Sequence, residues 1–170
     1  MIIVIPGVFS PTEVERIRGH LDAADWQDGN ATAGAQAQQV KQNQQLPLDS
    51  QLTRQLGEII LSTLGKHPTF ISAALPLKIF PPMFNRYRTG ETYGLHVDNA
   101  IRYAPGSPTP IRTDLSATLF LCSPQEYAGG ELVIEDNFGS QRIKLEAGDL
   151  VLYPSTSLHT VTPVSSGART

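Results

Sequence analysis

Two histidines and one aspartate stand where they could bind a metal ion together. His96 and Asp98 lie two residues apart in a stretch that we expect to be a β-strand, so their side chains project from one face. His159 lies in a second strand-like stretch near the end of the chain. Two imidazoles and one carboxylate on one face of an octahedron are the ligand set of non-haem Fe(II) oxygenases. We therefore predict that His96, Asp98 and His159 are catalytic residues that bind iron.

The His-x-Asp triplet alone is weak evidence, because such triplets arise by chance and a buried histidine is more often a hydrogen-bonded core residue. Two further residues suit the same chemistry. Three protein ligands leave positions on iron for O₂ and for a 2-oxo acid such as 2-oxoglutarate. Arg169, which we expect on a strand antiparallel to that of His159, has a planar guanidinium that suits the distant carboxylate of 2-oxoglutarate. Tyr87 could donate its hydroxyl to that carboxylate, and a core or rim tyrosine is an equally good interpretation.

The residues after His96 and Asp98 are candidates for contacts with substrate. Asn99 and Arg102 follow directly, and Arg102 could bind an anionic group, although a surface arginine in a loop is as good an interpretation. Residues 102–112 contain Pro and Gly and should form a long loop beside the site, of the kind that carries specificity. Residues 29–47 are rich in Ala, Gln, Asn and Gly, which indicates a disordered segment or a polar loop across the mouth.

The composition is that of one globular domain. The chain has 170 residues, 40% hydrophobic and 17% charged, which is enough to bury a core without disulfides. Its net charge of -3 gives no electrostatic case for nucleic acid or an anionic membrane as a partner. The single cysteine, Cys122, excludes an internal disulfide and suits a reducing compartment. We find no signal peptide and no run of membrane-spanning length, so we expect a cytoplasmic protein.

Helices are expected before residue 78 and strands after it. Ser10 and Glu13 form a capping box for one helix, and a second helix should run from about residue 49 to Gly65, with His67 capping its C-terminal turn. The many short strand-like segments that follow predict a sandwich or jelly roll with helices packed on one face. These segments are 78–88, 92–98, 115–122, 131–136, 141–145, 149–153 and 158–164, with a hairpin turn at 136–139.

The whole chain resembles the PKHD-type hydroxylases, which are iron- and 2-oxoglutarate-dependent dioxygenases of the prolyl 4-hydroxylase superfamily. The resemblance implies a mainly β fold with flanking helices (α+β), a double-stranded β-helix of the cupin-like jelly-roll type. It also implies Fe(II) bound by His96, Asp98 and His159, 2-oxoglutarate bound by Arg169 with Tyr87, use of L-ascorbate, and in some members a link to iron homeostasis. The matching stretches are 31–36, 81–87, 93–102, 127–132 and 147–164.

In that family the arginine opens a further strand and the chain continues beyond it, whereas this sequence ends at Thr170. We therefore expect one domain over 1–170, truncated at its C-terminus, with helical support over 1–77 and a β-helix core over 78–170.

The predicted activity is hydroxylation of a small-molecule or peptidyl substrate with O₂, releasing succinate and CO₂ from 2-oxoglutarate. The alternative is a jelly-roll module that binds a metal or small ligand without catalysis, and a zinc hydrolase is a more distant one because it leaves Arg169 without a purpose. Neither the substrate nor the oligomeric state can be read from the residues.

Overall fold

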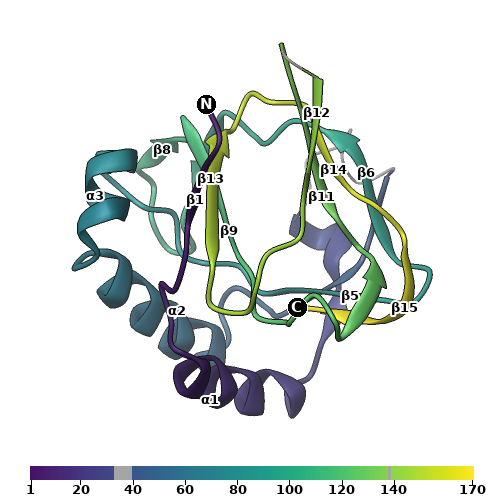
Figure 1. Cartoon of the computed structure of the whole chain (residues 1–170). Coiled ribbons are helices and arrows are strands. Elements are labelled where there is room, and N and C mark those ends of the chain that lie inside the picture. Colours follow the sequence, from purple (N-terminus) through teal and green to yellow (C-terminus); the bar gives the residue numbers. More distant parts are fainter. Residues whose placement is uncertain (33–39, 138) are drawn as a thin grey trace.

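A computed structural model describes residues 1–32, 40–137 and 139–170, so the middle of the predicted 29–47 loop lies outside the described residues. Three helices lie together on one side of a set of short strands (Figure 1). The helices are α1 (Pro11–Asp22), α2 (Gln51–Leu64) and α3 (Pro68–Ala74), with a short 3-10 turn η1 (Gly29–Thr32). The strands are β1 (Ile3–Ile5), β2 (Gln27–Asp28), β3 (Lys41–Gln42), β4 (Gln44–Gln45), β5 (Asn85–Arg88), β6 (Thr92–His96), β7 (Ile101–Tyr103), β8 (Pro110–Arg112), β9 (Leu115–Leu119), β10 (Tyr127–Gly129), β11 (Leu132–Asp136), β12 (Gly139–Ile143), β13 (Leu150–Pro154), β14 (His159–Val161) and β15 (Val164–Arg169).

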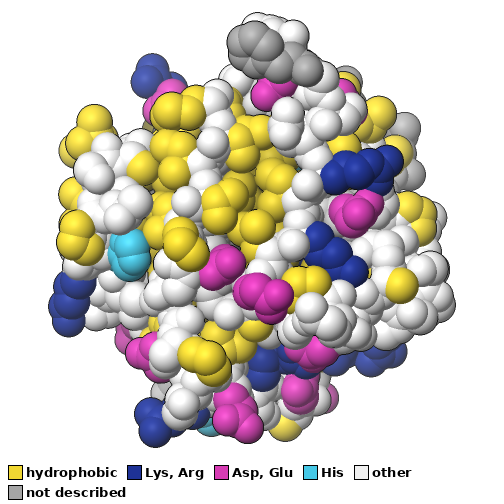
Figure 2. Space-filling view, viewed as in Figure 1, with side chains coloured by type: hydrophobic (Ala, Val, Ile, Leu, Met, Phe, Trp, Pro, Cys, Tyr) yellow, Lys and Arg dark blue, Asp and Glu magenta, His cyan; other side chains and the backbone are white. Residues whose placement is uncertain are grey.

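The strands pair antiparallel into sheets that face one another. Their orders are β1-β13-β9, β10-β15-β5-β4-β2, β12-β11-β14-β6-β3 and the separate pair β7-β8. In Figure 1 the layer of β1, β13 and β9 lies opposite the layer of β11, β12 and β14. Figure 2 shows hydrophobic side chains gathered between these two layers, in the middle of the face that is viewed. The predicted α+β jelly-roll fold is therefore confirmed.

Helix α1 begins where the capping box predicts. The Ser10 hydroxyl accepts the backbone N–H of Glu13, and the Glu13 carboxylate accepts the backbone N–H of Ser10 at 2.8 Å. One apolar stripe of α1 is buried, and so is most of the inner face of α2. Both helices pack against β1 and β13 in a first core cluster, whose members include Ile5, Val14, Ile17, Leu21, Leu56, Ile60, Leu150 and Leu152.

A second core cluster fills the space between the sheets. It is built from strands β5, β11, β12, β13, β14 and β15 together with Phe120, which directly follows β9. Because these strands alternate inward and outward side chains, their remaining inward positions are free to carry polar groups. The members are Tyr87, Phe120, Leu132, Ile134, Ile143, Val151, Tyr153, Val161 and Val164.

Two predictions about local structure are wrong. Residues 102–112 are not one loop, because β7 and β8 pair with Arg102 opposite Ile111, and the Pro- and Gly-rich part forms only the connection between them. His67 is the N-cap of α3, not a C-terminal cap of α2: its Nδ1 accepts the Phe70 N–H at 3.3 Å, and Pro68 starts a new helix. Strand β15, which carries Arg169, pairs with β10 and β5 and lies in another sheet than β14, which carries His159.

The predicted border between helical support and β-helix core is crossed by strand pairing. Strand β1 pairs with β13, β3 with β6, and β4 with β5, so the part before residue 78 also supplies sheet edges. The hairpin predicted at 136–139 is confirmed by the pairing of Asp136 with Gly139. No helix in the described part of the chain is long and apolar enough to cross a membrane.

Gly148 holds the turn before β13 in a conformation that alanine does not tolerate. Its φ is +97°, and a Cβ there would overlap the carbonyl oxygen of Phe9. We expect Gly148→Ala to lower the free energy of unfolding by more than about 2 kcal/mol, because backbone strain and steric overlap add. Urea denaturation followed by circular dichroism measures this loss.

Gly106 provides the matched control, because its φ is +74° but a Cβ would meet nothing within 4 Å. We expect Gly106→Ala to cost about 1 kcal/mol or less. Equal losses in the two variants would show that the contact with Phe9 does not matter.

Candidate metal centre

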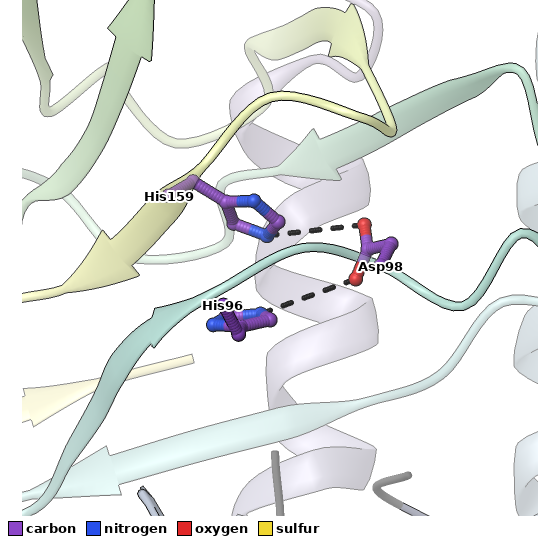
Figure 3. Close-up of side chains that lie close together, drawn as sticks. All are labelled: His96, Asp98 and His159. Carbon is purple, nitrogen blue, oxygen red and sulfur yellow. Dashed lines mark ion pairs between the residues drawn. The ribbon is translucent and has the colours of Figure 1, made fainter. Parts of the chain in front are cut away.

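The two histidines are brought together by strand pairing. Strands β6 and β14 run antiparallel, and the Cα of His159 lies directly opposite that of His96. Directly opposed side chains on one face of a sheet are neighbours, and here the two ring centroids are 4.2 Å apart. The convergence that was predicted from two distant stretches is therefore present (Figure 3).

Asp98 completes the group from just beyond the end of β6. Its Oδ1 lies 4.0 Å from Nε2 of His96 and its Oδ2 lies 3.8 Å from Nε2 of His159 (Figure 3). The backbone N–H of Asp98 donates to the carbonyl of Ser155 at 3.2 Å, which holds the residue in place after the strand has ended. The three ligand atoms lie within 4.8 Å of one another, so one ion can contact all three.

Each histidine is oriented by a backbone carbonyl two residues before it. Nδ1 of His96 lies 2.7 Å from the Gly94 carbonyl, and Nδ1 of His159 lies 2.9 Å from the Ser157 carbonyl. A carbonyl only accepts, so in the neutral form of each ring Nδ1 carries the proton and Nε2 keeps its lone pair. This is the tautomer that a metal bound at Nε2 requires.

The surroundings of His96 keep its imidazole neutral. Burial, together with the nearby His159 ring, lowers the pKa of His96 to about 4. Tyr93 stacks on the ring with centroids 3.6 Å apart and planes inclined by 14°. His96 is therefore uncharged at neutral pH, the form in which it binds a metal.

The Asp98 carboxylate is held by a serine on β9. The Ser116 hydroxyl donates to Oδ2 of Asp98. We expect Ser116→Ala to weaken binding of Fe(II) about tenfold or more, because losing an outer partner of a metal ligand typically costs that much. Anaerobic competition against a chromophoric chelator measures the affinity.

Ser140 is the matched control, since its hydroxyl also donates to a carboxylate, that of the half-buried Glu135 on the neighbouring β11. Ser140→Ala should leave the metal affinity unchanged. A Ser116→Ala protein that binds Fe(II) as tightly as the unmodified protein would contradict the role of Ser116.

The His96–Asp98–His159 group lies in the wall of a cavity of about 350 Å³. A larger and more open hollow of about 620 Å³ lies beside α1 and α2, at His20 and Glu58, but it brings no group of metal-binding side chains together among the described residues. The smaller cavity is therefore the one in which chemistry is expected.

Arg169 lines the same cavity as a buried cation. Its side chain reaches the carbonyl of Gly130, with Nη1 at 3.1 Å, and its guanidinium lies 5.1 Å from the Phe120 ring and 5.6 Å from the Tyr87 ring. Only 5% of Arg169 is exposed, yet no carboxylate of the described residues forms an ion pair with it. A buried charge without a counter-ion is costly, so this position favours an anionic ligand.

Tyr87 lies directly opposite Arg169 in the pairing of β5 with β15. It is buried, it lines the cavity, and burial raises the pKa of its hydroxyl, which therefore stays protonated and able to donate. Of the two predicted substrate residues, Arg102 is half-buried in the cavity wall, whereas Asn99 is exposed and is not part of that wall.

Several residues of the site were not identified from the sequence. The carbonyls of Gly94, Ser157 and Gly130 carry no side-chain signal. Ser116 did carry such a signal. By the two-residue alternation of the predicted strand 115–122 it shares a face with Phe120, and that face points at the site.

Comparisons with known proteins agree with this geometry of the site. The family model described as "2OG-Fe(II) oxygenase superfamily" matches residues 82–170. A "PKHD-type hydroxylase" of Saccharophagus degradans is 57% identical over 99% of this chain and 75% of its own length. One from Shewanella sp. (strain ANA-3) is 59% identical over 100% of this chain and 75% of its own length. The crystal structure of a Pseudomonas putida prolyl-4-hydroxylase has the same fold, with a TM-score of 0.66 and 20% identity over 99% of this chain and 87% of that one.

Proposed function

The chain belongs to the PKHD-type hydroxylases of the 2OG-Fe(II) oxygenase superfamily, and from that premise we propose which residues perform its reaction. His96, Asp98 and His159 bind Fe(II), and Arg169 with Tyr87 binds 2-oxoglutarate. The reaction inserts one atom of O₂ into a C–H bond of the substrate and converts 2-oxoglutarate to succinate and CO₂. The observation that carries this proposal is the placing of three metal-binding atoms within 4.8 Å in the wall of a cavity that also holds a buried arginine, which forms no ion pair with the described residues.

The residues present suit iron. Two neutral imidazole nitrogens and one carboxylate are the facial ligand set that leaves positions open for further ligands. Bound iron would supply the activation of O₂, which no side chain of the chain can provide. His96 and His159 present Nε2 to the metal from rings whose orientation is fixed. Ser116 keeps the Asp98 carboxylate from turning away.

The arginine end of the cavity suits the distant carboxylate of 2-oxoglutarate. The guanidinium of Arg169 offers a planar pair of N–H donors, and its position against Tyr87 and Phe120 fixes the plane of that pair. Tyr87 adds a hydroxyl donor from the paired strand. The aromatic walls also exclude water, which strengthens the interaction between guanidinium and carboxylate.

A metal-binding module without catalysis was the alternative from the sequence. Membership of a hydroxylase family favours an enzyme over a binding module, and the buried Arg169 is a physical reason for the same choice. A module that only binds a metal has no use for a buried cation beside the metal ligands.

The finer parts of the function stay predictions. They are the use of L-ascorbate as a reductant that keeps iron in the Fe(II) state, a link to iron homeostasis, a cytoplasmic location, a small-molecule or peptidyl substrate, and a contact between Asn99 and that substrate.

Mass spectrometry of candidate substrates tests the proposed function. Each candidate is incubated with the protein, Fe(II), L-ascorbate and 2-oxoglutarate in air, and the expected product is heavier by one oxygen atom. Succinate should form in equal amount. Formation of neither product, by protein shown to bind iron and 2-oxoglutarate, would count against the hydroxylase assignment.

A further inference from the structure

Arg102 is aimed into the cavity by the hairpin that the sequence did not predict. It is the middle residue of β7, and its neighbours Ile101 and Tyr103 are 50% and 62% exposed. Because strand side chains alternate, Arg102 points the other way, and it is half-buried in the wall of the cavity that holds His96, Asp98 and His159.

The guanidinium of Arg102 is held by apolar contacts, which leave its donors available. Its Cζ lies 4.1 Å from the centre of the Phe80 ring, and Nη2 lies 3.1 Å from Sδ of Met83. A thioether is a weak acceptor, and it engages one of five N–H donors. The stacked position on Phe80 fixes the plane of the remaining donors.

No carboxylate of the described residues forms an ion pair with Arg102. Arg112, on the other strand of the same hairpin, is different: its guanidinium is exposed and lies 3.0 Å from the Asp114 carboxylate. Arg142 is likewise paired with Glu131, at 2.6 Å. Arg102 is therefore the arginine of this hairpin that is placed to bind something other than the chain itself.

The charges of the site with Fe(II) and 2-oxoglutarate bound also leave Arg102 available for an external ligand. The acidic side chain that most favours the charged form of Arg102 is Asp98, which is itself a proposed iron ligand. Fe(II) with Asp98, and 2-oxoglutarate with Arg169, together carry no net charge, so the charge of Arg102 remains. Lys41, buried on β3, adds further positive potential: burial and the nearby Arg102 lower its pKa to about 8.

Apolar side chains also line this cavity. They include Ile79, Phe80 and Leu115, of which Ile79 and Leu115 are 36% and 39% exposed. A ligand that reaches Arg102 therefore meets hydrocarbon as well as a fixed cation.

We propose that the substrate is an organic carboxylate with an apolar body, whose carboxylate is bound by the guanidinium fork of Arg102 at the mouth of the cavity. This inference rests on the proposed function, because it names the substrate class of the same site. Binding the carboxylate at β7 holds the apolar body between Phe80 and Leu115, with the C–H bond to be oxidised on the side of His96, Asp98 and His159. A planar carboxylate suits the two-pronged donor geometry, and Arg102 acts as a specificity residue.

Matched pairs of acids and amides test the proposal. The protein is loaded with Ni(II), which does not turn over, and saturated with 2-oxoglutarate, and this binding is first measured by calorimetry. Phenylacetate and hexanoate are then titrated beside phenylacetamide and hexanamide, with phenyl phosphate as a further probe, and binding is followed by saturation-transfer NMR. We expect each acid to bind at least about tenfold more tightly than its amide, the effect of one hydrogen-bonded charge pair.

Three variants make the result specific. Arg102→Gln should remove the preference for the acids, Arg102→Lys should keep part of it, and Arg112→Gln should keep all of it, while every variant still binds 2-oxoglutarate. Equal binding of acid and amide, no binding of any acid, or a preference that survives in Arg102→Gln would each overturn the proposal, and tighter binding of phenyl phosphate would overturn the assignment to carboxylates. Failure of the unmodified protein to bind 2-oxoglutarate would instead count against the proposed function.

Discussion

Replacing His96 by alanine is expected to abolish formation of succinate from 2-oxoglutarate in the presence of Fe(II) and air. His96 supplies one of three ligand atoms, and its ring also packs between Tyr93 and His159. We expect turnover to fall by at least about a hundredfold, because even the loss of an outer partner of a metal ligand costs up to that much. Succinate is measured by mass spectrometry, and Asp98→Ala should behave in the same way.

His20 provides the matched control, because it is exposed near the end of α1 and lines a different hollow from the His96–Asp98–His159 group. His20→Ala should form succinate at the normal rate. If His96→Ala protein is folded by circular dichroism and still forms succinate at that rate, iron is not bound where we place it.

The second large effect is expected at Arg169. Its guanidinium is buried, and we propose that it pairs with the distant carboxylate of 2-oxoglutarate. Truncating one partner of a buried charge pair costs about 2–5 kcal/mol, so Arg169→Ala should raise the KM for 2-oxoglutarate by about thirtyfold or more. The rate at saturating 2-oxoglutarate should fall much less, because the iron ligands are untouched. Initial rates over a range of 2-oxoglutarate concentrations separate the two quantities.

Arg169→Lys and Arg142→Ala serve as controls. Lysine keeps the charge but not the planar fork, so an intermediate KM is expected. Arg142 is an exposed arginine in an ion pair on β12, and its removal should not change KM. An unchanged KM in Arg169→Ala would show that another cation of the chain binds the 2-oxoglutarate carboxylate.

The residue types of the site were readable from the sequence, but the pairing that unites them was not. The spacing of His96 and Asp98 and the character of the stretch around His159 pointed to one metal site. That His159 lies opposite His96 depends on the long-range register of β6 and β14, which no local pattern encodes. The same holds for Arg169: its presence in the cavity was predicted, but its place opposite Tyr87 depends on the register of β15 and β5.

Other structural features were not predicted, because their signals in the sequence were misinterpreted or absent. Pro and Gly in residues 102–112 indicated a loop, yet Pro105, Gly106 and Pro108 lie in the connection between β7 and β8, and Pro110 begins β8. The hairpin that results is what aims Arg102. His67 was assigned to the end of the second helix, although the proline that follows it suits the first turn of the next helix, which His67 caps. The helix starts, by contrast, depend on neighbouring residues alone and were predicted correctly at Ser10.

The most direct test is an anaerobic titration of the protein with Fe(II) and then 2-oxoglutarate, followed by visible absorption. If His96, Asp98 and His159 bind iron on one face, 2-oxoglutarate can chelate it on the other, and a weak charge-transfer band should grow to saturation at one equivalent of iron. The band should be absent from His159→Ala protein. An unmodified protein that binds both Fe(II) and 2-oxoglutarate without the band, or a His159→Ala protein that shows the band at full strength, would contradict the assignment.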